Sequence, residues 1–361
     1  MMKRKGFLLT MLLTVMVICL FSGCRKKSVG EAAGQTADGT NKKTYTFTAA
    51  CRADDKNLIS TPLGWFAKEI ESKTDGRIKI NIQYNGVLGS QGTEFEMLEN
   101  GICDIAVASL SSNADKWPSL TWVIVPGMVD SYTSQLACLK AVKNAGYLDA
   151  DFKSNDCHLM WWQPLESFNY GLTNKKVESL ADFKGLKIGY AGGEYIRKIL
   201  SNLGATAVGT NAGDFYLSLS TGVLDGFVNP ARYMYDAQFY EVVKYMPIGI
   251  TAGGSNNSVY ISNRAWNSLP EDLQKVFTEV CTEAEQLFVT TAEKQYSDEY
   301  NLLNQKGCEC YALDPDLIAT YADQCKSLSN EWVKDMEKNG HADASAMRDL
   351  VHTTISSMGN K

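Results

Sequence analysis

The chain repeats a strand–helix alternation, and this repetition limits its fold more than any other feature. Residues 45–50 alternate between apolar and polar side chains as a strand does, and residues from Pro62 onward show the apolar spacing of a helix with one buried face. Residues 78–84 alternate again, and a second helical pattern leads to residues 104–109, a continuous apolar run typical of a strand inside a parallel sheet. This order predicts an α/β unit with helices on both faces of its sheet.

The same alternation restarts in the second part of the chain. Strands are expected, with helices between them, at residues 158–163, 185–190, 205–208 and 223–228. Two α/β units predict two lobes with a ligand cleft between them, since open α/β sheets bind small molecules at the carboxyl ends of their strands. A helical pattern without Pro or Gly runs from Glu271 to about Gln305. Unbroken, it would measure about 55 Å, so it should brace both lobes.

The amino-terminal segment has the order of a secretory signal peptide. A short basic start precedes an apolar run over residues 7–21, which is too short to cross a membrane comfortably. The Ser-Gly-Cys sequence ending at Cys24 resembles a bacterial lipobox, although Phe21 stands where leucine is usual. We therefore expect a lipoprotein signal peptide over residues 1–23 and lipidation of Cys24, which would anchor the chain to the outer face of the cell membrane. An ordinary signal peptide followed by a chance cysteine is the alternative.

The segment after Cys24 and the charge of the mature chain limit its partners. Residues 25–43 are rich in Gly, Ala, Ser and Thr, with Val29 as the one large apolar residue. They cannot bury a core, so residues 24–43 are predicted to form a flexible tether. Without the signal peptide, 32 of the 35 Lys and Arg residues remain, compared with 41 Asp and Glu residues. The net charge is therefore −9 with His counted as neutral. This acidic balance argues against a nucleic-acid partner.

Cysteine and histidine usage predicts no metal site. Cys19 and Cys24 belong to the export segment, and the other eight cysteines are scattered without a paired CxxC spacing. Only three histidines accompany them, so metal-ligand spacing is absent and no cofactor is implied. Buried free thiols that pack as small apolar residues are expected, with disulfides as the alternative. These eight are Cys51, Cys103, Cys138, Cys157, Cys281, Cys308, Cys310 and Cys325.

The sequence also lacks the motifs of an enzyme. No GxSxG, phosphate loop or HExxH motif is present. Cys157 and His158 are neighbours on an expected strand, so their side chains should point to opposite faces and cannot form a catalytic pair. We therefore expect a binding protein.

A series of short blocks between residue 45 and about residue 313 resembles the DctP-type solute receptors of TRAP (tripartite ATP-independent) transporters. Residues 73–80 (KTDGRIKI) are similar to the family's "KTGGRIKV", and residues 180–188 (LADFKGLKI) to its "DLKGLKI". The remaining blocks follow in the family's order: residues 87–90, 99–101 with 104–107, 161–162 before 173–175, 214–216 through 221–226, 229–230 and 266–270.

The resemblance implies two α/β lobes joined by crossing strands and a long bracing helix, with a ligand cleft that closes on a small organic solute. It places residues 44–166 and 252–295 in lobe I, and residues 167–251 and 296–361 in lobe II. It also implies that the receptor delivers its solute to a large and a small membrane subunit, without ATP and without catalysis.

The chain departs from the family at two positions that usually hold basic residues. The family's ligand-clamping arginine falls on Gly189, which Tyr190 follows, and a second basic position falls on or near Asn169. Because bidentate arginine–carboxylate pairs are strong and geometrically specific, their loss predicts a ligand other than a typical clamped dicarboxylate.

Other residues are candidates for contact with the ligand. Aromatic faces for a ring or a cationic group are expected from Trp161 or Trp162, Tyr170 and Tyr190. Asn229 matches the family's cleft asparagine. Alternatively, a carboxylate ligand is retained and one of three arginines replaces the missing clamp: Arg52, Arg197 or Arg232.

Two other classes of receptor stay open. The binding protein of an ABC-type importer has the same two-lobed architecture, although the ordered blocks favour a TRAP receptor. A ligand sensor that docks on a membrane histidine kinase is not excluded by any residue of the chain. The neighbouring genes would distinguish these classes.

Overall fold

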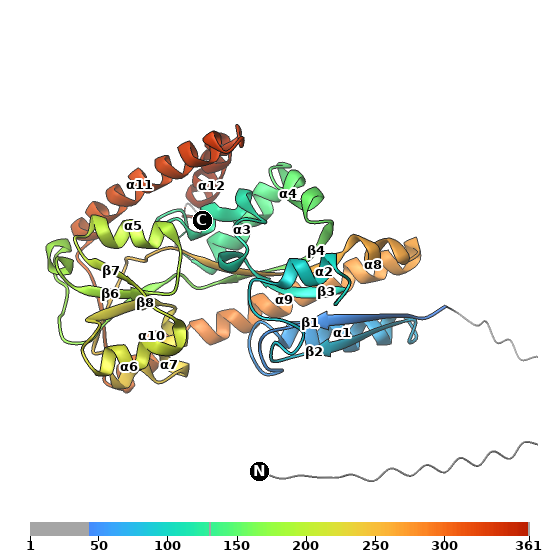
Figure 1. Cartoon of the computed structure of the whole chain (residues 1–361), viewed down its shortest axis with the longest axis horizontal. Helices are drawn as coiled ribbons and strands as arrows, with labels where there is room; N and C mark the ends of the chain where they lie inside the picture. The colour runs from blue at the N-terminus through green and yellow to red at the C-terminus, as the bar shows by residue number, and fades with distance from the viewer. Residues whose placement is uncertain (1–42, 130, 360–361) are drawn as a thin grey trace, which may run out of the picture. The chain divides into compact units, whose positions relative to one another are not determined.

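The computed structural model describes residues 43–129 and 131–359. The predicted signal peptide, Cys24 and all of the predicted tether except Lys43 lie outside these residues. No helix in the described part of the chain is long and apolar enough to span a membrane. The described chain contains two sheets with helices around them, which confirms the predicted α/β class with two lobes (Figure 1).

The first sheet has five strands in the order β2-β1-β3-β10-β4. β1 runs parallel to β2 and β3, whereas β10 is antiparallel to both β3 and β4. The long strands β4 and β10 arise far apart in the sequence and pair over most of their length. The bounds are β1 Tyr45–Ala50, β2 Ile78–Gln83, β3 Ile105–Ser109, β4 Cys157–Leu165 and β10 Ser255–Ser262.

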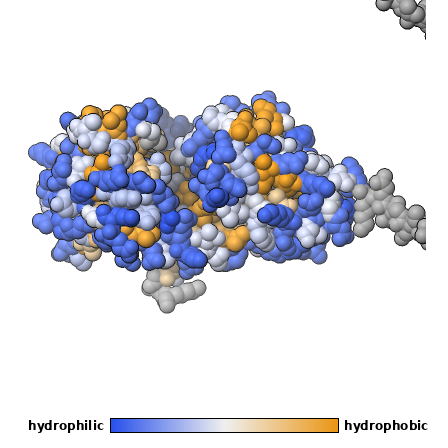
Figure 2. All heavy atoms as spheres, turned by 90° about the horizontal axis from the view of Figure 1, so that it is seen from below, coloured by the Kyte–Doolittle hydropathy of each residue, from blue (hydrophilic) through white to orange (hydrophobic). Residues whose placement is uncertain are grey.

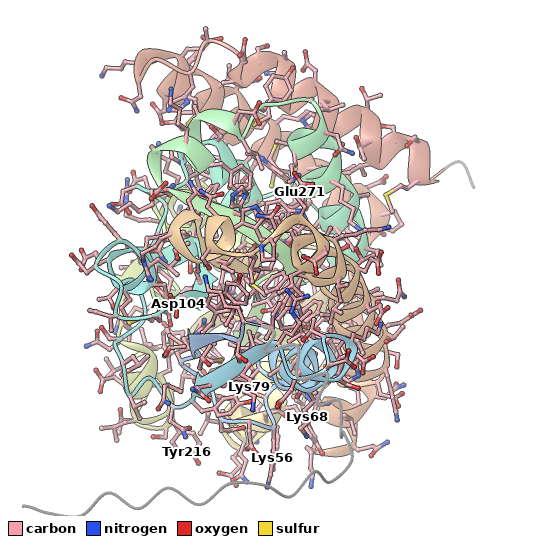
Figure 3. The ribbon with its side chains drawn as sticks, turned by 90° about the vertical axis from the view of Figure 1, so that its right-hand side faces the viewer. Lys56, Lys68, Lys79, Asp104, Tyr216 and Glu271 are labelled. Atoms are coloured by element: carbon pink, nitrogen blue, oxygen red, sulfur yellow. The ribbon has the colours of Figure 1, made fainter. Side chains whose placement is uncertain are left out.

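Both faces of the first sheet are buried. On β3, Ile105 and Val107 pack into the core formed with helix α1 (Thr61–Lys73), while Ala106 and Ala108 belong to the core on the opposite face. The predicted continuous apolar strand is therefore confirmed. Asp104 precedes β3 (Figure 3); it accepts a hydrogen bond from the backbone N–H of Thr48 (2.9 Å) and pairs with Arg264.

The second sheet has six strands in the order β11-β9-β5-β8-β6-β7. β6 is parallel to β7 and β8, and β5 is antiparallel to β8 and β9. The parallel β6–β8 pair follows from the second strand–helix alternation of the sequence. The bounds are β5 Asn169–Leu172, β6 Lys187–Tyr190, β7 Thr206–Gly209, β8 Gly226–Asn229, β9 Tyr245–Ile248 and β11 Glu309–Ala312.

Two chain segments cross from one sheet to the other and hydrogen-bond to each other. Residues 166–168 join β4 to β5, and residues 249–254 join β9 to β10. Phe168 N–H donates to the carbonyl of Gly253 (2.8 Å), and Ala252 N–H donates to the carbonyl of Phe168 (2.8 Å). Gly253 has a φ of 126°, and a Cβ there would lie 2.5 Å from the Ile124 carbonyl oxygen, so only glycine fits.

The predicted bracing helix is present but divided. Helix α9 (Glu271–Tyr296) packs on α1 and on β4 of the first sheet. Helix α10 (Glu299–Gln305) packs on α7 (Ala231–Asp236) and on β11 of the second sheet. The helical pattern does not run unbroken, because Ser297 and Asp298 form a turn. Serine and aspartate hydrogen-bond to nearby backbone and therefore favour such interruptions over helix interiors.

The carboxyl-terminal helices pack across elements that the sequence assigned to different lobes. Helix α11 (Pro315–Lys338) contacts α5 (Glu194–Asn202) near the second sheet, while α12 (Ala344–Gly359) packs on α3 (Tyr132–Asn144). The Nε1–H of Trp332 on α11 donates to Oγ1 of Thr121 (2.9 Å), which adds a contact to residues of predicted lobe I. Helix α12, which lies in the residues assigned to lobe II, thus packs on a helix assigned to lobe I.

Short helices fill the connections. Polar residues dominate the surface shown in Figure 2, with apolar residues in scattered groups. The remaining α-helices are α2 Glu94–Glu99, α4 Asp149–Ser154, α6 Phe215–Ser220, α7 Ala231–Asp236 and α8 Asn263–Ser268. The 3-10 helices are Leu110–Ser112, Pro118–Ile124, Leu180–Phe183, Ala212–Asp214 and Phe239–Glu241.

Candidate ligand-binding site

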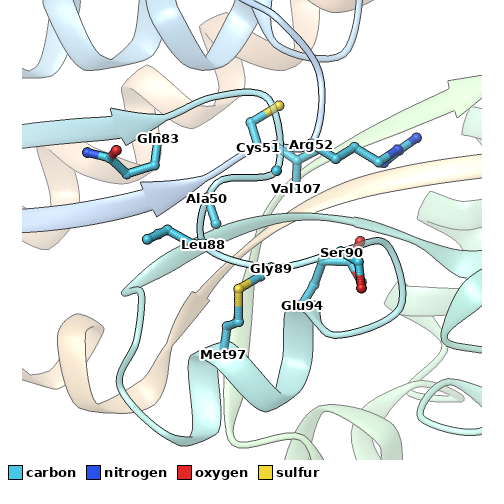
Figure 4. Close-up of a pocket in the computed structure, with 11 residues that line it drawn as sticks. Ala50, Cys51, Arg52, Gln83, Leu88, Gly89, Ser90, Glu94, Met97 and Val107 are labelled. Carbon is cyan, nitrogen blue, oxygen red and sulfur yellow. The ribbon is translucent and has the colours of Figure 1, made fainter.

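A pocket lies at the carboxyl ends of β1 and β2, next to the start of α2 (Figure 4). These two strands are parallel, so their carboxyl ends and the loops that follow meet at one edge of the sheet. Open α/β sheets bind small molecules at such edges. The lining residues are Ala50, Cys51, Arg52, Gln83, Gly86, Leu88, Gly89, Ser90, Glu94, Met97 and Val107.

Arg52 brings a positive charge into this pocket directly after β1. Its Nη2 donates a hydrogen bond to Oδ1 of Asn257 on β10 (3.3 Å). Its Nη1 is buried and has no hydrogen-bond partner among the described residues. Burial lowers the pKa of Arg52, and the nearby charge of Glu94 partly opposes that shift. The guanidinium is thus largely removed from water, and Nη1 can still donate to an acceptor that the described residues do not supply.

Glu94 brings a negative charge to the same pocket from the first residue of α2. Its side chain is buried, with 4% of the residue exposed. Oε2 accepts hydrogen bonds from the backbone N–H of Gly92 (2.7 Å) and from Nδ2 of Asn113 (3.0 Å). Oε1 is buried and finds no donor in the part of the chain that the structure describes.

Two amide side chains beside Arg52 are also incompletely paired. Asn257 on β10 and Gln163 on β4 are register neighbours and fully buried. Nδ2 of Asn257 and Oε1 of Gln163 lack partners within the described ranges. Nearly all buried polar atoms of folded proteins are hydrogen-bonded, so this concentration of unpaired donors and acceptors makes the region a candidate site for a polar molecule.

A second polar group surrounds the crossing segment after β4. Glu166 is buried, with 8% of the residue exposed, and its Oε2 accepts a hydrogen bond from the backbone N–H of Arg232 (3.3 Å). Burial raises the pKa of Glu166 to about 8, a shift that its contact with Arg232 only partly offsets.

The structure brings three of the predicted site residues together near Glu166. Asn169 and Asn229 are paired residues of β5 and β8. Asn169 is buried, and its Oδ1 accepts a hydrogen bond from the Tyr300 hydroxyl (3.3 Å). Arg232 lies on α7 shortly after Asn229, but its guanidinium already pairs with Asp236 (2.9 Å). Arg232 is one of the three arginines considered as replacements for the clamp, and it already forms an ion pair with Asp236.

The predicted aromatic contacts are mostly core residues. Trp161 and Trp162 pack into the cores on opposite faces of the first sheet, and only 2% of Trp162 is exposed. Tyr170 is fully buried and shares a hydrogen bond between hydroxyls with Tyr321 (2.9 Å); burial raises its pKa strongly. Tyr190, at the end of β6, is the one of the four that is half-buried. Alternation along a strand places successive side chains on opposite faces. At Trp161 and Trp162, both faces of β4 are buried.

Gly189 occupies a position where a longer side chain does not fit. A Cβ on Gly189 would lie 2.6 Å from Cδ1 of Leu224 and 2.8 Å from Cε1 of Phe215. The space next to this residue is filled by the apolar core of the second sheet. An arginine, which the resemblance leads one to expect at this position, would have no room there.

Substitution of Gly189 by alanine should destabilise the fold by about 1–3 kcal/mol, because overpacking a tight core forces its neighbours aside. Urea unfolding followed by circular dichroism measures this. Gly209→Ala, at the end of the neighbouring strand, is the matched control because a Cβ there meets nothing within 4 Å. Equal stability of the two variants would contradict the packing described for Gly189.

Arg197 and the cysteines complete the set of predicted positions. Arg197 is exposed on α5 and pairs with Glu194, three residues earlier in the same helix. It therefore lies away from the buried polar groups described above. All eight cysteines of the described chain are free, and seven of them are buried, in agreement with their interpretation as packing residues.

Sequence reasoning missed Glu94, Glu166, Asn257 and Gln163. A glutamate at a helix start is ordinarily solvated, and nothing in its local sequence reveals that Glu94 is covered. The one available signal was position, since Glu94 and Arg52 each follow a strand of the first sheet along the chain.

Comparison with known proteins supports a solute receptor. The family "bacterial extracellular solute-binding protein, family 7" (DctP) matches residues 52–335. A solute-binding protein of Chromohalobacter salexigens is 27% identical over 180 residues, which are 50% of this chain and 53% of that protein. The C4-dicarboxylate-binding protein DctB of Bacillus subtilis is 25% identical over 65% of this chain and 66% of its own length.

Solved structures share the fold. A TRAP periplasmic solute-binding protein from Ochrobactrum anthropi superposes with a TM-score of 0.79 at 21% identity, covering 88% of this chain and 97% of that one. One from Sulfitobacter sp. NAS-14.1 with bound β-D-galacturonate has a TM-score of 0.73 at 18% identity, covering 85% and 99%. The chain belongs to the DctP family of bacterial extracellular solute-binding proteins.

Proposed function

We propose that this chain is an extracytoplasmic lipoprotein that captures a small organic acid and delivers it to the membrane subunits of a TRAP transporter. Membership of the DctP family supports the transporter class, and similar structures were solved with acids such as β-D-galacturonate and pyroglutamate. The proposed lipid anchoring rests on the amino-terminal sequence, and the proposed delivery rests on family membership.

The observation that carries the proposal for the ligand is the unpaired Nη1 of Arg52. A buried guanidinium nitrogen that has no acceptor among the described residues is costly unless a ligand supplies one. A carboxylate fits best, because charge-assisted hydrogen bonds are about twice as strong as neutral ones. Arg52 would thus take the place of the arginine that is missing at Gly189. Because Asn169 is also uncharged, the ligand would not be a typical dicarboxylate held by two basic residues.

Thermal unfolding of the mature protein against a panel of small acids tests this function. A ligand at 100 times its dissociation constant stabilises the folded state by about 2.7 kcal/mol, which corresponds to a rise of several degrees in Tm for a chain of this size. We expect such a rise with at least one carboxylate. Stabilisation confined to uncharged or cationic solutes would contradict the assignment of Arg52 as a carboxylate contact.

Lipid anchoring gives a separate prediction. Replacement of Cys24 by alanine should release the protein from the membrane fraction, because acyl chains contribute about 0.8 kcal/mol per buried methylene to membrane binding. Fractionation of cells expressing either form, with mass spectrometry of the amino-terminal peptide, measures this. An unmodified Cys24 in membrane-bound wild-type protein would contradict lipidation.

A further inference from the structure

Three sulfur-bearing side chains come together on one face of the second sheet, at its edge. β11 is an edge strand and pairs in parallel with β9. Cys310 of β11 is the register partner of Met246 of β9, and register partners in a parallel pair point their side chains to the same face. Cys308 lies in the same buried cluster as Met246, and Cys310 packs against that cluster. Two thiols and one thioether therefore share one location.

The two thiols interact directly with each other. Cys308 is fully buried, and Cys310 is half-buried. Hydrogen bonding between them lowers the pKa of Cys308 and raises the pKa of Cys310. The nearby charge of Lys244 also favours the thiolate form of Cys308, whereas burial opposes it. Since thiolates and not thiols bind metals, Cys308 is the better prepared of the two as a ligand.

A disulfide fits this pair of thiols less well than a shared metal ion does. Residues two positions apart on a strand are separated by about 6.6 Å along the chain, whereas the Cβ atoms of a disulfide lie about 3.5–4.5 Å apart. A disulfide would therefore distort the start of β11. A metal ion needs less movement, because two metal–sulfur bonds of about 2.3 Å bridge sulfur atoms that are up to about 4.6 Å apart.

The donor atoms select the class of ion. Thiolate and thioether sulfur atoms are soft ligands that favour Cu(I) over hard cations such as Mg²⁺ or Ca²⁺. Structural Zn²⁺ sites take four ligands, and within residues 43–129 and 131–359 no group of three or more His, Cys, Asp or Glu side chains could hold a metal ion. One Cu(I) with two thiolates has a net negative charge, which the neighbouring Lys244 would offset.

We propose that Cys308, Cys310 and Met246 form a binding site for one cuprous ion, separate from the candidate solute site beside the first sheet. Each thiol gives its proton to solvent as its sulfur binds the ion, so binding releases up to two protons and involves no oxidation. The half-buried Cys310 gives the ion access from the edge of the sheet. The spacing of cysteines and histidines does not reveal this site, because its third donor is a methionine on another strand.

Copper titration of the mature protein tests the site. All forms carry Cys24→Ala, so that this cysteine adds no free thiol. Without oxygen, with ascorbate as reductant and bicinchoninate as competing chelator, the parent protein should retain one cuprous ion per chain. X-ray absorption at the copper edge should show three sulfur atoms at about 2.3 Å. A protein that retains no copper, or an ion surrounded by nitrogen or oxygen atoms, would overturn the inference.

Variants assign the ion to these side chains. Cys310→Ser should lower the affinity for Cu(I) about 100-fold or more, because loss of even an outer-shell partner of a metal costs about 10–100-fold. Met246→Leu nearly keeps the side-chain volume and should lower the affinity about 10-fold. Cys281→Ser is the matched control, because Cys281 is a buried free thiol in the core beside the first sheet. It should change the affinity less than about twofold, as expected for an independent site.

The outcomes of the variant series separate a built site from scattered thiols. Equal losses for Cys281→Ser and Cys310→Ser would overturn the site, and an unchanged affinity in Met246→Leu would overturn the three-sulfur set. Circular dichroism checks that each variant folds. If Cys310→Ser fails to fold, X-ray absorption of the parent protein and of Met246→Leu still decides the proposal.

Discussion

Truncation of Arg52 to alanine is expected to weaken binding of the physiological solute about 100-fold or more. Removing one partner of a buried charge pair typically costs 2–5 kcal/mol, because the other charge is left buried and unpaired. In this protein the ligand carboxylate would lose its guanidinium, and Asn257 would lose the hydrogen bond that Arg52 donates to it. Titration calorimetry with the acid found in the thermal panel measures the loss directly.

Two further variants show whether this loss is specific. Arg52→Lys keeps the charge but not the planar group, so it should recover part of the affinity and not all of it. Arg197→Ala is the matched control, since this arginine is exposed and its ion-pair partner in the described part of the chain is Glu194 of the same helix. It should change the affinity less than about twofold. A loss for Arg197→Ala equal to that for Arg52→Ala would contradict the placement of the acid beside Arg52.

The second large effect expected is a pH dependence of stability that Glu166 causes. The pKa of its carboxyl rises from an ordinary 4.5 to about 8 in the folded protein because of burial. Between these values the folded state holds a proton that the unfolded state has lost, so folding stability falls as the pH rises through this window and levels off above it. A pKa difference of one pH unit between the two states corresponds to about 1.4 kcal/mol, which makes the total decline roughly 2–5 kcal/mol.

Replacement of Glu166 by glutamine removes this titration. The variant should be comparable to wild type near pH 4 and more stable than wild type near pH 9, as measured by urea unfolding at several pH values. Two neighbouring tyrosines do not titrate in this window, because burial raises the pKa values of Tyr296 and Tyr300, the latter to about 12. Asp236 lies beside Arg232 in both proteins and cancels from the comparison.

A control separates Glu166 from general effects of charge. Glu279 is exposed on α9, so Glu279→Gln should give a stability profile parallel to that of wild type. Parallel profiles for Glu166→Gln and wild type would contradict the burial described for Glu166.

The strand–helix order was predictable because it rests on local periodicity. Continuous apolar residues gave β3, and alternation gave β1 and β2, since burial on one or two faces of a sheet leaves a direct trace in the sequence. The interruption of the bracing helix at Ser297 and Asp298 was missed, because a polar pair of this kind also occurs on exposed helix faces. The packing of α12 on α3 depends on contacts between distant segments, which local patterns do not encode.

The candidate site was predictable where the chain position alone fixes it. Arg52 was accessible to sequence reasoning because it follows the first strand, at an edge where ligands bind. Glu94 was not, because its burial depends on Gly92 and Asn113 folding over it. Trp162 and Tyr170 were predicted as ligand contacts because of their aromatic side chains, but tertiary packing buries both residues.

A crystal structure of the mature protein with its bound acid tests the central claim most directly. The carboxylate should lie about 2.7–2.9 Å from Nη1 of Arg52, as in other charge-assisted hydrogen bonds. An acid bound elsewhere, with Arg52 still bonded only to Asn257, would contradict the account.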